Sequence, residues 1–257
     1  MLERIVFRWR GVLLSLVGIA ATLWLGWSGQ LGLYIHPRYF VFTMVAATVA
    51  GVLVVAAFAF VPLARDETHD EETDEHLHEQ RRWPLLAAVA SGALIIAATV
   101  SLLVLPPTSL STGGVSAADL STGTAVGASL ENPETLVGGD YASFTVKDWS
   151  ALLRQGVDEQ FLAGKEADVI GFVTPDESNP ENLFYLARFA VTCCAVDAQP
   201  VGIAVHSPGW SEDFAAGDWV QVAGGFVTNP STSSATPIVL DAAEIAVIDE
   251  PSEPYVY

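Results

Sequence analysis

Three long runs without a charged residue constrain this chain more than any other feature of its sequence. They span about residues 11–30, 39–63 and 84–105, and none contains Asp, Glu, Lys, Arg or His. A helix that rises about 1.5 Å per residue crosses a hydrocarbon core about 30 Å thick in about 20 residues. Because backbone groups in lipid must find partners within the segment, spanning runs are expected to be helical. The sequence therefore predicts an α-helical membrane domain over residues 1–105 with three transmembrane helices.

The first run admits a second interpretation, that of a cleaved signal peptide. Arg4, Arg8 and Arg10 precede it as the basic residues of such a peptide would. The run is long, however, and no clear A-x-A cleavage site follows it, so an uncleaved anchor is favoured. Core helices of a soluble protein are disfavoured by the length of all three runs.

The basic residues near the span ends predict the orientation of the chain. Six lie before the first run or around the loop 64–82, at Arg4, Arg8, Arg10, Arg65, Arg81 and Arg82. Only Arg38 lies in the loop between the first two runs. Because basic residues are retained on the cytoplasmic side, we expect the amino terminus and residues 64–82 inside and residues 106–257 outside the cytoplasmic membrane.

The charge of the chain is concentrated in its second half. The formal net charge is −19, although 51% of the residues are hydrophobic. Residues 1–130 hold 7 Lys and Arg against 10 Asp and Glu, whereas residues 131–257 hold 4 against 20. Such an acidic surface excludes nucleic acid as a partner, since it cannot neutralise phosphates. Spans without ionisable groups make a poor pore, which favours an anchor or an accessory subunit.

The predicted cytoplasmic loop, residues 64–82, combines imidazoles with acidic side chains. His69, His76 and His78 lie among eight carboxylates. Imidazole and carboxylate together suit zinc and similar divalent ions, which would make the loop a weak metal sensor. The spacing matches no closed tetrahedral site, and a solvated acidic loop has the same composition. The solvated loop is the favoured interpretation.

The composition changes again after the third run. Residues 106–140 are rich in Ser, Thr, Gly and Pro, which is typical of a linker. Thr145 and Asp148 form a capping pattern for a short helix that ends at Gly156. The strand-like segments that follow are Asp168–Val173, Leu183–Cys194, Val201–His206, Trp219–Thr228 and Ile238–Ile248. Five strands in the outer domain, residues 141–257, predict an OB-like five-stranded barrel, with a β-sandwich as the alternative.

The densest chemistry lies in the segment RFAVTCCAVDAQP, residues 188–200. Alternation along a regular strand places Cys193 inward and Cys194 outward. The two cysteines can be structural thiols, a metal-capturing pair, or a redox pair whose strained neighbour disulfide is labile. Asp197 and His206 are the residues that could complete a metal site with them. These three interpretations stay open at the level of sequence, and a divalent metal such as zinc is the cofactor expected if one binds.

The same segment carries a resemblance to a known family. It is similar to the signature of YcgQ-type bacterial membrane proteins, which are described as permease subunits. The matching positions are Arg188, Phe189, Cys193, Cys194, Ala195, Asp197, Ala198 and Pro200, with Ile35, His36, Pro37 and Arg38 between the first two runs and Pro254-Tyr255 near the end. The resemblance implies an accessory subunit beside a multi-span permease partner in the lipid bilayer, and it identifies no catalytic residue.

The expected function follows from the resemblance together with the charge pattern. We expect an accessory subunit of a bacterial permease system whose acidic outer domain binds or gates a cation. An enzyme is not expected, because no nucleophile, base and orienting group can be assembled from these residues. The alternatives are an extracytoplasmic thiol or metal enzyme and a binding module on a membrane anchor.

Overall fold

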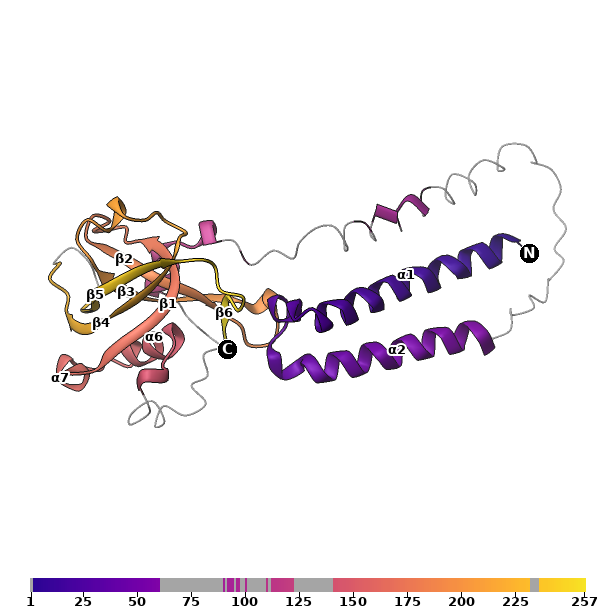
Figure 1. Ribbon diagram of the computed structural model, residues 1–257, viewed down its shortest axis with the longest axis horizontal. Helices are drawn as coiled ribbons and strands as arrows, with labels where there is room; N and C mark the ends of the chain where they lie inside the picture. Colours follow the sequence, from indigo (N-terminus) through magenta and orange to yellow (C-terminus); the bar gives the residue numbers. More distant parts are fainter. Residues whose placement is uncertain are drawn as a thin grey trace, which may run out of the picture. The chain divides into compact units, whose positions relative to one another are not determined.

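The chain separates into two compact units, which are described one at a time. The computed structural model describes residues 2–60, 90, 92–94, 96, 97, 100, 110, 112–122, 141–231 and 236–257 (Figure 1). The helical unit comprises Met1–Leu31 and Pro37–Pro107, and the β unit comprises Gly32–His36 and Thr108–Tyr257. A five-residue piece from between the first two apolar runs therefore belongs to the β unit.

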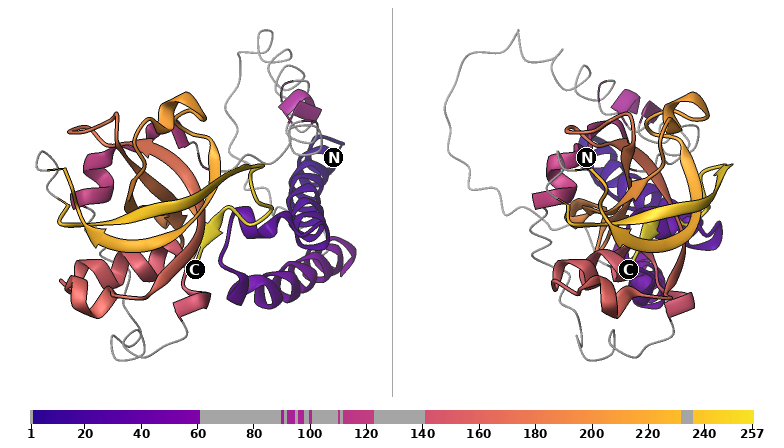
Figure 2. Two further views of the ribbon diagram at one scale, coloured as in Figure 1. Left: turned by 60° about the vertical axis from the view of Figure 1, so that its left-hand side comes forward. Right: turned by 90° about the vertical axis from the view of Figure 1, so that its left-hand side faces the viewer.

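The described part of the helical unit contains two long helices that lie side by side (Figures 1 and 2). They are α1 (Leu2–Trp27) and α2 (Phe40–Phe60), and the short helices η1 (Gln30–Leu33) and η2 (Pro37–Tyr39) lie between them in the chain. Small residues allow the two backbones to approach, since Gly51 lies against the side chain of Ile19.

One described helical segment, Pro37–Phe58, is long and apolar enough to cross a membrane. The apolar helix Gly11–Trp27 is shorter than that criterion requires. The described positions between residues 90 and 100 are helical, but most of the run 84–105 and the whole loop 64–82 lie outside the described residues. The arrangement with three spans, and the orientation in the membrane, therefore stay predictions.

The β unit is built on a six-stranded sheet. Its strands are β1 (Glu166–Pro175), β2 (Leu183–Ala190), β3 (Gln199–His206), β4 (Trp219–Thr228), β5 (Ile238–Ile248) and β6 (Tyr255–Val256). The strand order is β1-β4-β5-β3-β2-β6, and β1 also pairs with β2. The pairings of the first five strands therefore return to their starting strand. Figure 2 shows β4 and β5 curving strongly as they cross the domain.

Short helices cover the sheet. They are α4 (Ala117–Thr122), α6 (Val146–Arg154) and α7 (Glu159–Leu162), with 3-10 turns η3 (Thr112–Gly114), η4 (Tyr141–Ser143), η5 (Ala195–Asp197) and η6 (Trp210–Glu212). The predicted cap of α6 is confirmed: Thr145 and Asp148 bond each other's backbone N–H groups, and Gly156 follows the helix with a φ of 75°. Within the segment predicted as a linker, α4 buries Ala117 and Leu120.

The core of the β unit has two parts. The larger part joins α6 to the sheet, where the fully buried Trp149 packs against Phe226 with their ring centroids 4.7 Å apart. The smaller part contains Phe172, Tyr185 and Trp219 with Leu120 of α4. Amphipathic α6 is the element that explains this arrangement, because it turns Trp149 and Leu152 toward the sheet while its polar face stays outside.

Candidate functional site

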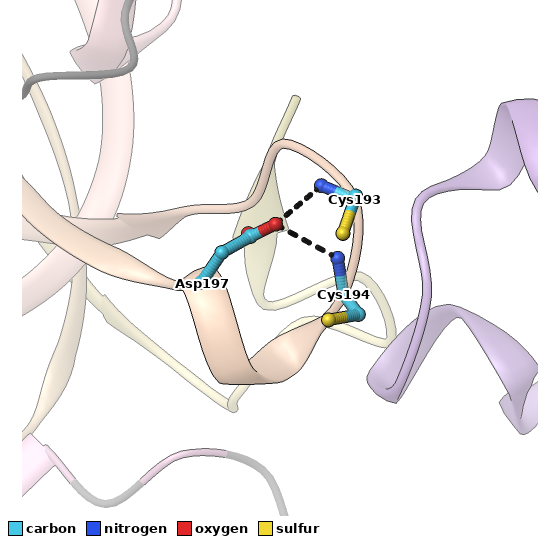
Figure 3. Close-up of side chains that lie close together, drawn as sticks. All are labelled: Cys193, Cys194 and Asp197. Carbon is cyan, nitrogen blue, oxygen red and sulfur yellow. Dashed lines mark hydrogen bonds between the residues drawn. The ribbon is translucent and has the colours of Figure 1, made fainter.

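The two cysteines lie on a turn that follows β2, and Asp197 determines the shape of that turn. One oxygen of its carboxylate accepts the backbone N–H of Thr192 at 2.9 Å. The other accepts those of Cys193 at 2.7 Å and Cys194 at 3.2 Å (Figure 3). N–H groups that converge on one carboxylate cannot also extend a β-ladder. We refer to residues 191–198 as the cysteine turn.

The cysteine turn corrects the predicted orientation of the two thiols. A strand over Leu183–Cys194 was expected, but β2 ends at Ala190. Without strand alternation, the prediction that Cys193 points inward is wrong: Cys193 is exposed and Cys194 is half-buried. The physical reason is the competition of a nearby Asp side chain for backbone donors, which favours a turn over a strand.

The turn brings three ligand-type groups together. The sulfur atoms of Cys193 and Cys194 and a carboxylate oxygen of Asp197 all lie within 4.8 Å of one another. Figure 3 shows the two thiols and the carboxylate gathered within this one turn of the chain. Thiolate and carboxylate are groups that Zn²⁺ binds in proteins, at about 2.0–2.3 Å from the metal, so a modest contraction of this group could enclose an ion.

The electrostatics of the turn keep Cys193 protonated. A hydrogen bond from its thiol to the Asp197 carboxylate, followed by a contact with Cys194, raises the pKa of Cys193 to about 12. Nucleophilic and redox reactions of cysteine require the thiolate, which is scarce at neutral pH when the pKa is this high. A soft cation can still bind, because it replaces the thiol proton, and binding then releases protons.

Asp197 should make the stability of the β unit depend on pH. Partial desolvation raises the pKa of Asp197, but hydrogen bonds from the Cys193 thiol and from three backbone N–H groups outweigh it, so the pKa lies below its ordinary value. The carboxylate therefore stabilises the fold above the pKa of an unfolded Asp, about 4, and this contribution is lost as the pH falls through the lower folded pKa. Denaturation of the wild type and of Asp197→Asn should show a stability difference at pH 7 that shrinks below pH ~4. A difference that does not change with pH would contradict the assignment.

The segment Gly32–His36 lies against the cysteine turn within the β unit. Ile35 pairs with Cys194 in an antiparallel bridge. The N–H of His36 donates to the carbonyl of Cys193 at 3.0 Å, and the N–H of Ala195 donates to that of Tyr34 at 2.8 Å. Two residues that the resemblance singled out, His36 and Cys193, are thus hydrogen-bonded across more than 150 residues of sequence.

Tyr257 holds the other side of this segment. Its hydroxyl donates to the carbonyl of Gly32 at 3.0 Å, and its ring lies 4.7 Å from the His36 ring between centroids. We expect Tyr257→Phe to speed hydrogen exchange at the His36 amide about fivefold, since one such hydrogen bond is worth about 1 kcal/mol. Tyr255→Phe is the matched control, because that hydroxyl accepts from Leu110 instead. Equal effects of the two variants on His36 would contradict the assignment.

Arg188 and Phe189 bind the C-terminal residues 253–255 through hydrogen bonds and strand pairing. The Arg188 guanidinium donates to the carbonyls of Pro254 at 3.1 Å and Tyr255 at 3.2 Å, and also to that of Glu253. It lies over the Trp219 ring, and burial lowers the pKa of Arg188. Phe189 pairs with Tyr255 of β6. These two residues hold β6 beside β2, next to the start of the cysteine turn.

The remaining predicted residues lie elsewhere. The Nδ1 of His206 is 2.9 Å from a carboxylate oxygen of Asp241, at the end of β3, and His206 does not belong to the group at the cysteine turn. Arg38 lies in η2 of the helical unit. His69, His76 and His78 lie outside the described residues. Sequence reasoning missed Ile35 and Tyr257 as neighbours of the site, because nothing local in the sequence signals these contacts.

Comparison with known proteins finds two adjacent domains of one family. Residues 10–120 match the DUF1980 N-terminal domain, and residues 147–257 match the DUF1980 C-terminal domain. No curated protein and no solved structure matches the chain. The N-terminal match contains Gly32–His36 and the C-terminal match contains the cysteine turn, so the two segments that meet at the candidate site come from the two matched domains. With both domains present and most of its residues matched, the chain belongs to the DUF1980 family.

Proposed function

We propose that this protein is an accessory subunit of a bacterial membrane permease system whose outer domain captures a soft divalent cation such as Zn²⁺. The observation that carries the proposal is the group of two thiols and one carboxylate within 4.8 Å at the cysteine turn. Membrane attachment is supported by the apolar segment Pro37–Phe58. The role beside a permease rests on the resemblance.

The chemistry of the site suits capture and release better than permanent binding. Zn²⁺ would replace the protons of Cys193 and Cys194 and accept an oxygen of Asp197 as the third ligand, with up to two protons released. Three protein ligands leave a fourth position open, as in sites that exchange a ligand. Cys193 is exposed and Val196, in the same turn, is 95% exposed, which supports access of another protein to the site. The acidic domain adds a field that attracts cations.

The wider architecture of the proposal is an OB-like barrel on a membrane anchor. The pairings that run from β1 through β4, β5, β3 and β2 back to β1 support the barrel. Gly32–His36 and the strands belong to one compact unit, which supports placing the loop between the first two apolar runs and the outer domain on the same side of the membrane. This agrees with the orientation expected from the basic residues.

The raised pKa of Cys193 disfavours the alternative of a thiol enzyme. Such an enzyme needs a thiolate at working pH, and the hydrogen bond to Asp197 stabilises the thiol instead. A metal-capturing role has no such requirement, because the cation itself drives deprotonation.

The proposal is tested by metal stoichiometry on the full chain in mild detergent, with both thiols reduced. Equilibrium dialysis against Zn²⁺ should give one bound ion per chain, and binding in weakly buffered solution should release protons. A reduced chain that binds no Zn²⁺ overturns the metal role. Affinity purification from membranes should recover a multi-span protein, and recovery of the chain alone overturns the accessory role.

A further inference from the structure

An unpaired strand edge lies at the C-terminal end of β5. This strand pairs with β4 along its whole length, from Ile238 to Ile248. On its other edge it pairs with β3 only at Leu240 and Asp241. Beyond these two residues, no described strand pairs with that edge, and no backbone hydrogen bond from a described turn or loop reaches it. We refer to Glu244–Ile248 as the β5 edge.

A bulge in β5 accounts for its separation from β3. The partner of Ala223 is Glu244 and the partner of Gly224 is Ala242, so Ala243 is an extra residue on β5. A bulge of this kind bends its strand and increases the local twist. After the bulge, β5 continues regularly beside β4, and its far edge has no partner strand within the described part of the chain.

The β5 edge presents different side chains on the two faces of the sheet. Ile245 and Val247 lie opposite the buried Val222 and Val220 of β4, so they are on the face of the larger core. Val247 is nevertheless 58% exposed, because no described strand lies on its far side. Glu244 is on the opposite face, since side chains alternate along a strand. A strand added here would therefore cover apolar side chains on one face and meet a carboxylate on the other.

Native proteins usually protect an exposed strand edge against pairing with other chains. Lysine, proline and very short strands are common means of protection. The β5 edge, with the sequence EIAVI, contains neither lysine nor proline, and Asp249 and Glu250 follow it. Residues paired in an antiparallel ladder alternate between those that bond the partner strand and those whose N–H and C=O groups point to the other edge. The β5 edge therefore offers backbone donors and acceptors to a further strand.

The charges around the edge indicate which partner fits. Glu244, Asp249 and Glu250 are exposed, and none of them forms an ion pair with a described Lys or Arg. Residues 131–257 hold 4 Lys and Arg against 20 Asp and Glu, a balance that attracts cationic segments. A second copy of this chain would bring the same carboxylates to the edge, and like charges on neighbouring strands destabilise their pairing. A basic segment forms opposite-charge pairs instead.

We propose that the β5 edge is a docking surface for an extended segment of another protein, in which basic and apolar residues alternate. The segment adds a strand beside β5, and its backbone bonds the unpaired edge. Its apolar side chains cover Ile245 and Val247, and its Lys or Arg side chains pair with Glu244 on the other face. The surface shares no residue with the cysteine turn, so the proposal goes beyond the proposed function and is tested separately from it.

The test measures binding of a peptide to the full chain in a neutral maltoside detergent. The probe is the fluorescein-labelled peptide Lys-Val-Lys-Val-Lys-Val-Lys, followed by fluorescence anisotropy. Its control has the same composition in the order Lys-Lys-Lys-Lys-Val-Val-Val, which keeps the charge but removes the alternation. We expect the alternating peptide to bind about tenfold more tightly, because only this peptide places basic and apolar side chains on opposite faces of a strand. Hydrogen exchange of the complex should show new protection at Glu244–Ile248.

Substitutions in the β5 edge locate the contacts. Glu244→Lys should weaken binding of the alternating peptide about tenfold, since it replaces attraction between the strands by repulsion. Glu166→Lys is the matched control, because it makes the same change at an exposed position of β1, and it should alter the affinity less than about twofold. Val247→Lys should weaken binding about tenfold as well, since an edge lysine opposes an added strand. Thermal unfolding and Zn²⁺ binding of all three variants should match the wild type.

Four outcomes would overturn the proposal. Equal binding of the two peptides would show that alternation does not matter, and equal losses in Glu244→Lys and Glu166→Lys would show a response to net charge alone. Protection confined to strands other than β5 would place the peptide elsewhere. A dimer of the full chain that forms without peptide and is disrupted by Val247→Lys would identify a second copy as the occupant of the edge.

Discussion

Replacing Cys193 and Cys194 together by serine is expected to lower the affinity of the full chain for Zn²⁺ by about 1,000-fold, or about 4 kcal/mol. The double variant leaves Asp197 as the only remaining ligand of the group, and a single carboxylate holds zinc weakly. Serine keeps the size of the side chain but offers a hydroxyl that zinc does not deprotonate as it does a thiol. Competition with a chromogenic zinc chelator at pH 7 measures the loss.

His206→Gln is the matched control for this prediction. His206 is a metal ligand by residue type, but it contacts Asp241 and lies outside the group at the cysteine turn. Its replacement should change the zinc affinity less than twofold. A loss in His206→Gln as large as in the cysteine variants would show that the ion sits elsewhere. Single cysteine variants should fall between the wild type and the double variant.

The sequence correctly predicted the start of α6 and the ends of β4 and β5, because residues close to them in the chain determine these boundaries. The capping pair Thr145 and Asp148 marks the start of α6, because both partners of the cap lie within one turn of the helix. The ends of β4 and β5 also fall where predicted, at Trp219–Thr228 and Ile238–Ile248. In each case the hydrophobic run is bounded by turn-forming residues, such as Asn229 and Pro230.

The end of β2 could not be predicted from the alternation of hydrophobic and polar residues. The stretch from Thr192 to Cys194 continues the strand pattern in composition, yet its N–H groups bond Asp197 instead of a neighbouring strand. The side chain that decides the outcome lies three to five residues further on. A carboxylate at that distance can accept the backbone N–H groups that would otherwise pair with a neighbouring strand. A pattern of hydrophobic residues carries no information about such side-chain hydrogen bonds.

The contacts that complete the candidate site are non-local, which is why they were not predicted. The strand β6 has two residues and therefore no periodicity, and it pairs in parallel with Phe189 and Ala190 of β2. Gly32–His36 reaches the cysteine turn across more than 150 residues. The resemblance named three separate motifs, at His36, at the run from Arg188 to Pro200, and at Tyr255. Only the fold shows that His36 bonds Cys193 and that Arg188 bonds Tyr255.

Arg188→Met is expected to release the C-terminal strand and to destabilise the β unit by about 2–3 kcal/mol. The substitution keeps much of the apolar stem over Trp219 but removes the donors for the carbonyls of residues 253–255. Hydrogen bonds from a charged donor are worth about 1.5–3 kcal/mol, and carbonyls left unbonded at a partly buried site add to the loss. Urea denaturation of the full chain measures the change in the free energy of unfolding, and carboxypeptidase digestion reports the release of β6.

The same variant also tests whether the C-terminal strand supports the candidate metal site. The N–H of Val191, at the start of the cysteine turn, donates to the carbonyl of Val256 at 3.0 Å, so the turn is anchored on β6. If β6 is released, we expect the affinity for Zn²⁺ to fall as well, by about tenfold, although no ligand has changed. Arg188→Lys should give an intermediate loss, since an ammonium cannot reproduce the planar fork, and Lys147→Met should cost no more than about 0.5 kcal/mol. Unchanged stability and unchanged digestion in Arg188→Met would show that the guanidinium does not hold the strand.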